Sequence, residues 1–146
     1  MKRFEIINHT ADMGIKAYGK DLAELFTNAA YGMASLITDL EKVSPKDSED
    51  ISLRAESREE LLVSWLNEIL FLFASKNMLF SKFEVSEIDE RHLRAKISGE
   101  EFDTTRHQIE TEFKAATYHR LKISKVRGDN STLPEGIFQA EVIFDI

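Results

Sequence analysis

Acidic residues near the two ends of the chain have the chemistry of metal ligands. Asp12 closes the tetrapeptide His9–Thr10–Ala11–Asp12, which lies between two predicted strands. At the other end Asp145 precedes Ile146, so a side-chain carboxylate and the terminal carboxylate lie one residue apart. Oxygen donors of this kind suit Ca²⁺, Mg²⁺ or Mn²⁺. The residues alone leave two simpler interpretations open: Asp12 could close an Asx-turn, and the terminus could be a solvated chain end.

The run Lys114–Ala115–Ala116–Thr117–Tyr118–His119 carries a second set of polar groups. Lys114, Arg120 and Lys122 share a predicted strand face with Tyr118. They form a small basic patch that could touch phosphate or an acidic partner, or could simply face solvent. The four histidines of the chain could supply a zinc site. No two of them have a short helical spacing, so hydrogen-bonded structural roles are the alternative.

Two stretches have the periodicity and start signals of helices. Apolar side chains recur at three- and four-residue spacing over residues 22–37, with Asp21 as the N-cap and Glu24 completing a capping box. The second stripe covers residues 61–73, and Ser57 followed by Glu60 gives the same start signal. Each helix needs an apolar face to pack against.

The rest of the chain alternates with period two, which predicts strands. They are expected within residues 4–6, 15–17, 51–53, 113–126 and 138–144. Residues 80–99 are predicted to form a hairpin that turns near residues 89–91. Strands before, between and after the helices favour an α+β fold, with two amphipathic helices packed on one side of a mostly antiparallel sheet. The length of 146 residues predicts a single domain, residues 1–146.

Composition excludes several classes of function. The chain has 19 basic and 26 acidic residues, a net charge of −7 and no cysteine. A disulfide scaffold, a thiolate zinc finger and a cysteine nucleophile are therefore excluded. The acidic balance argues against tight, unaided RNA binding. Fingerprints of nucleotide-binding loops, zinc proteases and serine hydrolases are missing. Because the sequence shows neither a signal peptide nor a membrane span, we expect a cytoplasmic protein.

Four blocks of sequence, taken in order, resemble the archease family. They are HTADMGIKAYGKDLAELFTNAAYGM at residues 9–33, WLNEIL at 65–70, KAATYHRLKI at 114–123 and VIFDI at 142–146. The combination of HTAD near the start, KAATYH late and FDI at the end is far more specific than any one piece. The resemblance implies an α+β fold built on a strand–helix–strand–strand unit with an insertion.

The resemblance also implies that the chain is an accessory factor and not itself an enzyme. Archeases assist the RNA-splicing ligase in tRNA splicing and RNA repair, promoting its GTP-dependent guanylylation and its multiple turnover. RNA would be contacted mainly through the ligase. Two alternatives stay open: a chaperone or modulator of a tRNA-modifying methyltransferase, and a small metal-dependent phosphoesterase in which His9 or His119 acts as base.

The resemblance finally implies a metal site, which the family forms from the aspartate of its HTAD motif, the aspartate of its FDI motif and the last residue. These positions are Asp12, Asp145 and Ile146. The ligand chemistry predicts a calcium-type oxygen site, with magnesium and manganese also compatible. Supporting or partner-contacting roles are expected for His9, Lys114, Tyr118 and His119.

Overall fold

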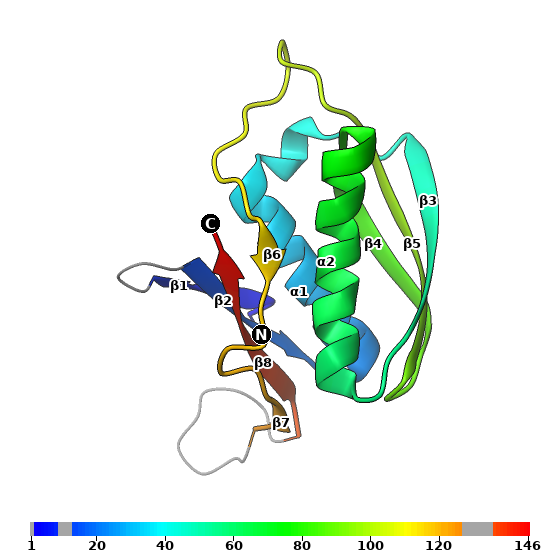
Figure 1. The fold of residues 1–146 in the computed structure, drawn as a ribbon, viewed down its shortest axis with the longest axis vertical. Helices are drawn as coiled ribbons and strands as arrows, with labels where there is room; N and C mark the ends of the chain where they lie inside the picture. Colours follow the sequence, from blue (N-terminus) through cyan, green and yellow to red (C-terminus); the bar gives the residue numbers. More distant parts are fainter. Residues whose placement is uncertain (1, 9–12, 127–135) are drawn as a thin grey trace.

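The computed structural model describes residues 2–8, 13–126 and 136–146. In this part of the chain two helices lie between two antiparallel sheets (Figure 1). The larger sheet has the order β1-β2-β8-β6, with β7 also paired to β8, and the smaller sheet has the order β3-β5-β4. The elements are β1 Phe4–Asn8, β2 Met13–Gly19, α1 Leu22–Ile37, the 3-10 helix η1 Leu40–Lys42, β3 Asp47–Arg54, α2 Arg58–Lys76, β4 Met78–Ile88, β5 His92–Glu101, β6 Ala115–Ala116, β7 Ile123–Lys125 and β8 Phe138–Asp145.

Both helices begin where the sequence predicts. The Asp21 carboxylate accepts the backbone N–H of Glu24 at 2.8 Å, and the Glu24 side chain accepts the N–H of Lys20 at 3.2 Å. At the start of α2 the Ser57 hydroxyl accepts the N–H of Glu60 at 3.1 Å. These contacts satisfy amide groups that have no partner within the first turn of a helix.

The core fills the space between the helices and the two sheets. Trp65 of α2 is fully buried, and its indole N–H donates to the carbonyl of Phe26 in α1 at 2.9 Å. The same ring meets Phe83 of β4 edge to face, with ring centroids 6.5 Å apart. One side chain thus joins both helices to the smaller sheet, as expected for a large amphipathic aromatic residue.

The α+β class, the two helices and the antiparallel pairing are confirmed. The predicted hairpin is β4 and β5, where Ile88 pairs with Leu93 across the turn. One detail differs from the prediction of a single sheet on one side of the helices. The strands divide between two sheets, so the layer formed by the two helices has a sheet on each side. The short apolar runs of β3, β4 and β5 do not encode which other strands they join.

No helix in the described part of the chain is long and apolar enough to cross a membrane.

The region 113–126 is not one continuous strand. Its two short strands, β6 and β7, both pair with β8, and a turn separates them. The N–H of Leu121 donates to the carbonyl of Tyr118 at 3.0 Å, and Arg120 has a left-handed φ of 59°. Alternation of side chains across a sheet holds only while the backbone stays extended. The predicted common strand face of Lys114, Tyr118, Arg120 and Lys122 is therefore replaced by a turn that exposes these side chains.

Candidate functional site

The candidate site lies at the end of β8, where the sequence predicts metal ligands. Asp145 is the last residue of β8 and is exposed. Its backbone pairs with Ala115 of β6, and its carbonyl accepts the N–H of Lys114 at 2.8 Å. The preceding Phe144 is fully buried and stacks on Phe113 with centroids 4.5 Å apart. A buried aromatic anchor and a backbone ladder therefore fix the Cα of Asp145 while its side chain faces solvent.

The other predicted ligand, Asp12, comes directly before β2 in the sequence. Met13, the first residue of β2, is the Cα partner of Phe144. Asp12 precedes Met13 in the sequence and Asp145 follows Phe144. Asp12 and His9 themselves lie outside the described residues. In the described part of the sheet, the sequence neighbours of the two predicted aspartates, Met13 of β2 and Phe144 of β8, therefore lie opposite each other.

Lys114 lies at this end of the sheet, whereas Tyr118 and His119 follow β6, which runs antiparallel to β8 and leads away from Asp145. All three side chains are exposed, and Tyr118 keeps 58% of its surface accessible. Thr117 fixes the start of the following turn, because its hydroxyl and its N–H both donate to the carbonyl of Ile143, at 2.9 and 3.0 Å. Of these three residues, Lys114 is bonded directly to Asp145, and the other two lie further along the strand side that faces β8. Ile146, the other predicted ligand, is 56% exposed.

Helix α2 anchors β6 and β7 with polar side chains that sequence reasoning missed. The Asn67 amide oxygen accepts the N–H of Ala116 at 2.7 Å, and its nitrogen donates to the carbonyl of the same residue at 3.3 Å. Further along, the Glu59 carboxylate accepts the N–H of Ile123 at 3.0 Å, and Arg58 donates to its carbonyl at 2.9 Å. The helix side chains thus make the hydrogen bonds that a neighbouring strand would make. No sequence signal marks them, because polar residues beside an apolar stripe usually face water.

A buried polar cluster joins the segment after β5 to the loop after η1. The Glu100 carboxylate is 1% exposed and accepts from Arg106, from the N–H of Ser44 at 2.6 Å and from His107 Nε2 at 3.1 Å. The Arg106 guanidinium, followed by the Ser44 amide, lowers the pKa of Glu100 to about 2. His107 Nδ1 accepts a backbone N–H at 3.0 Å, so its Nε2 carries hydrogen toward Glu100 and the carbonyl of Lys42. This cluster is structural, since all its buried polar groups have partners.

The described histidines do not converge on a metal. His107 belongs to the buried cluster, and His92 contacts Asp89 at the β4–β5 turn. Nowhere in residues 2–8, 13–126 and 136–146 do three His, Asp or Glu side chains form a group that could hold an ion. Within this part Asp145 and Ile146 supply oxygen donors of the type that a hard cation needs. These two residues would need further oxygen ligands, from protein or from water, to complete the shell of such an ion.

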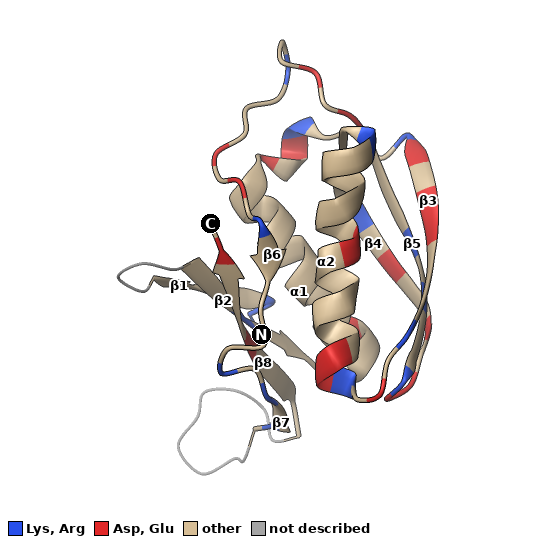
Figure 2. Ribbon diagram, in the orientation of Figure 1, with Lys and Arg blue, Asp and Glu red and all other residues tan. Residues whose placement is uncertain are grey.

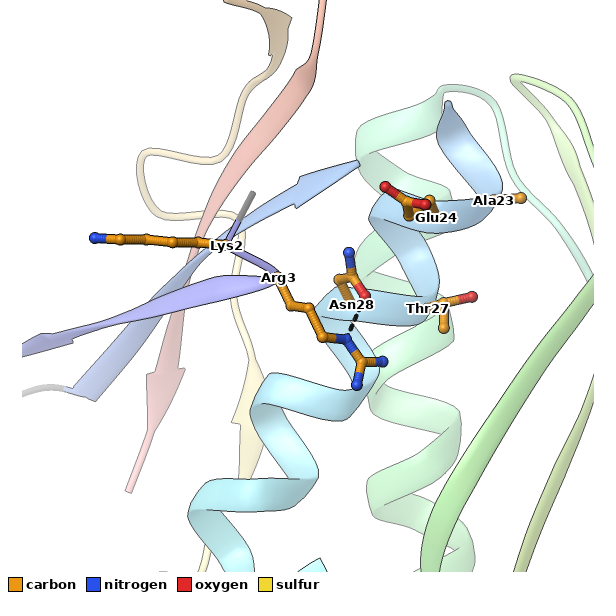
Figure 3. Close-up of a pocket in the computed structure, with 6 residues that line it drawn as sticks. All are labelled: Lys2, Arg3, Ala23, Glu24, Thr27 and Asn28. Atoms are coloured by element: carbon orange, nitrogen blue, oxygen red, sulfur yellow. Dashed lines mark hydrogen bonds between the residues drawn. The ribbon is translucent and has the colours of Figure 1, made fainter. Parts of the chain in front are cut away.

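A surface pocket of about 500 Å³ lies elsewhere, between the start of the chain and α1 (Figure 3). Its lining includes Arg3 and Asn28, and Arg3 Nε donates to the Asn28 side-chain oxygen at 2.9 Å. Asn28 is buried and donates to the carbonyl of Tyr18 at 2.7 Å, while the Arg3 guanidinium stacks 3.8 Å above the ring of Tyr31. These contacts hold the residue before β1 and the strand β2 against α1. The pocket contains none of the predicted site residues.

The whole chain is similar in sequence to known proteins. The model of the Archease protein family (MTH1598/TM1083) matches residues 4–146. The chain belongs to the archease family. An archease of Sulfurisphaera tokodaii is 44% identical over 125 residues, which are 84% of this chain and 89% of that protein.

Solved structures agree with the archease fold. The solution structure of Methanobacterium thermoautotrophicum protein 1598 has a TM-score of 0.82 and 37% sequence identity, covering 100% of both chains. The crystal structure of a Thermotoga maritima archease, described as a "possible chaperone", has a TM-score of 0.59 and 21% identity, covering 100% of this chain and 98% of that one. At that identity the second structure supports the fold alone. The resemblance to archeases seen in the sequence is confirmed.

Proposed function

We propose that this archease is a non-enzymatic accessory factor that activates the RNA-splicing ligase in tRNA splicing and RNA repair. It promotes guanylylation of the ligase by GTP and its multiple turnover. The observation that carries the proposal is the family match over residues 4–146. The described part of the site agrees with it, because the side chains of Lys114 and Asp145 are exposed where a protein partner can reach them.

The proposal includes a divalent cation held by Asp12, Asp145 and Ile146. The register supports this set: Met13 and Phe144 are partners, and each is bonded to one of the two aspartates. The described chain positions next to the two aspartates therefore face each other at this end of the sheet. The donors are all oxygen, as Ca²⁺, Mg²⁺ and Mn²⁺ prefer. A bound ion would supply concentrated positive charge at the surface offered to the ligase.

The chain's own residues have separable tasks in this proposal. Phe144 and the β6 ladder hold the backbone of Asp145, and Asn67 holds β6 in turn. The backbone of Lys114 is bonded to the carbonyl of Asp145, and its exposed side chain serves as a contact for the ligase. In this proposal the cation and the contact group beside it form the charged surface that the ligase recognises.

Multiple-turnover ligation tests the proposed function. RNA ends bearing a 2′,3′-cyclic phosphate and a 5′-hydroxyl are joined by the partner ligase with GTP and Mn²⁺, with ligase in limiting amount. We expect wild-type protein to increase product per ligase, and Asp145→Asn to abolish the increase. Asp50→Asn, an exposed aspartate of β3, is the matched control and should stimulate like the wild type. No stimulation by the wild type would refute the proposal.

Two further measurements separate the alternatives. Cleavage of the cyclic phosphate by the protein alone would favour a phosphoesterase, and recovery of a tRNA methyltransferase without the ligase would favour the modulator. Calorimetric titration with Mn²⁺ and with Ca²⁺ tests the cation site directly. Asp145→Asn should weaken binding at least about tenfold, since a carboxylate ligand is lost, whereas Asp50→Asn should not. Equal affinities of both variants and the wild type would refute the ligand assignment.

A further inference from the structure

The run from Lys114 to Val126 has an unusual charge for this acidic protein. It carries four basic residues and no acidic one, in a chain of net charge −7. We call residues 114–126 the cationic segment. Figure 2 shows blue along it from the start of β6 to β7. All four basic side chains are exposed: Lys114, Arg120, Lys122 and Lys125.

These positive charges are not neutralised within the described part of the chain. No carboxylate there lies within 4.0 Å of any of the four, which is the distance of an ion pair. The elements packed against the segment do carry acidic residues, Glu59 of α2 and Glu141 and Asp145 of β8. The Glu59 carboxylate is already used by the N–H of Ile123 and lies 3.7 Å from Arg58. Lys125 lies over the ring of Phe138, 5.1 Å from its centroid, so the segment presents Lys114, Arg120 and Lys122 to a polyanion.

An aromatic ring is exposed in the middle of these charges. Tyr118 is 58% exposed at the start of the turn that separates β6 from β7. Arg120 completes that turn with φ 59°, a left-handed conformation that is unfavourable for residues with a Cβ. Tyr118, His119 and Arg120 are consequently all turned to solvent. Strained backbone retained in an exposed loop is typical of segments that bind something.

The cationic segment is held in place before any ligand arrives. Asn67 fixes Ala116 on one side of the turn, and Glu59 with Arg58 fixes Ile123 on the other. Thr117 is bonded to the carbonyl of Ile143. A loop anchored at both ends loses little conformational freedom on binding, so weak individual contacts suffice.

We propose that the cationic segment binds single-stranded RNA, with Arg120 and Lys122 on phosphates and Tyr118 stacked on a base. A row of cations with an exposed aromatic ring is the arrangement that proteins use for single strands without sequence preference. An acidic protein surface would need the charges but not the ring. The choice of RNA over DNA rests on the proposed function. Because Lys114 bonds the carbonyl of Asp145, a bound strand would run along the edge that carries the candidate site.

The net charge of the protein predicts how this binding behaves. At −7 the protein as a whole repels a polyanion, so affinity is low and falls steeply with salt. Each phosphate contact contributes about 0.7 to the slope of log affinity against log salt for a single strand. Loss of Arg120 and Lys122 should therefore reduce the slope by about 1.4, twice that contribution.

Fluorescence anisotropy of a labelled oligouridylate with the protein alone tests the proposal. Arg120→Gly/Lys122→Gln should bind more weakly and with the smaller slope. The control Lys46→Gln/Lys96→Gln removes two exposed cations elsewhere and reaches the same net charge, so its slope should stay that of the wild type. Glycine relieves the left-handed position, so the first variant should stay folded, as circular dichroism can check. Equal weakening in both pairs would overturn the proposal.

Tyr118→Leu separates RNA from an acidic protein partner. It keeps an apolar side chain but removes the ring, and RNA affinity should fall roughly fivefold or more. Polyglutamate is the competitor: if it displaces RNA as well as unlabelled oligouridylate does, and Tyr118→Leu has no effect, the segment serves an acidic protein and the proposal is wrong. The ligase is absent from these measurements, so failure of ligase activation leaves them unchanged.

Discussion

Replacing Asn67 tests whether its side chain makes the backbone hydrogen bonds to β6 that a neighbouring strand would otherwise make. In α2 its side-chain amide satisfies both backbone groups of Ala116, which is 4% exposed. Ala116 in turn pairs with Phe144, next to the candidate metal ligand Asp145. The change Asn67→Ala should therefore weaken the fold and loosen the edge that carries the site.

The size of the effect follows from the two contacts. The N–H of Ala116 bonds at 2.7 Å and is lost from a buried position, which costs about 1–3 kcal/mol. The longer contact at 3.3 Å contributes less. Alanine has a higher helix propensity than asparagine and returns about 0.7 kcal/mol. The net loss should be about 2 kcal/mol, or a fall in Tm of roughly 4–8 °C for a domain of this size.

Thermal melting and hydrogen exchange measure the two consequences separately. In Asn67→Ala the amides of Lys114 and Thr117, which donate to the carbonyls of Asp145 and Ile143 near the end of β8, should exchange faster than in the wild type. The control is Glu68→Ala, one residue further along α2, where no side-chain hydrogen bond to the described residues is lost, so its Tm should change little. If both variants melt and exchange alike, Asn67 does not hold β6 and the argument fails.

Three other changes test the fold. Arg106 chiefly lowers the pKa of Glu100 to about 2, so the stabilising effect of this carboxylate is complete above pH 4.5 and is lost as the pH falls toward 2. In urea unfolding, the difference in stability between the wild type and Glu100→Gln should therefore shrink over this pH range. Parallel pH profiles of the two proteins would contradict this. Trp65→Phe removes the bond to Phe26 and leaves a cavity, so circular dichroism should show a loss of about 2 kcal/mol, and an unchanged Tm would contradict it. Gly99→Ala places a Cβ against the backbone of β4 and should prevent soluble expression, whereas a soluble variant with the wild-type Tm would refute the close approach.

The sequence predicted the elements well because their signals are local. Asp21 and Ser57 each cap a helix through an amide three residues on, so the start of each helix can be read from a few neighbouring letters. The β4–β5 hairpin is equally local, since its register follows from alternation and a short turn. The class follows from these locally encoded elements, and the predicted α+β fold with antiparallel pairing is confirmed.

Features that depend on distant parts of the chain could not be predicted. Nothing in β3 states that it joins β5 in a second sheet, because an alternating strand fits any apolar face of the right size. The Glu100 cluster was missed because its partners Ser44 and Arg106 come from separate loops. The candidate site is an intermediate case: Asp145 is exposed at the end of β8 as expected, while the roles of Asp12, Asp145 and Ile146 as metal ligands stay predictions.

The placement of α2 explains how one sheet edge can carry both a fixed ligand and an exposed loop. A single long strand beside β8 would have buried the turn at Tyr118 in a ladder. Here β6 and β7 are too short to be stable alone, and Asn67, Arg58 and Glu59 supply their outer hydrogen bonds from the helix. Helix side chains can satisfy two short strands at separate points, which leaves the chain between them free to turn outward. The same helix therefore fixes the backbone at Asp145 and presents the cationic segment next to it.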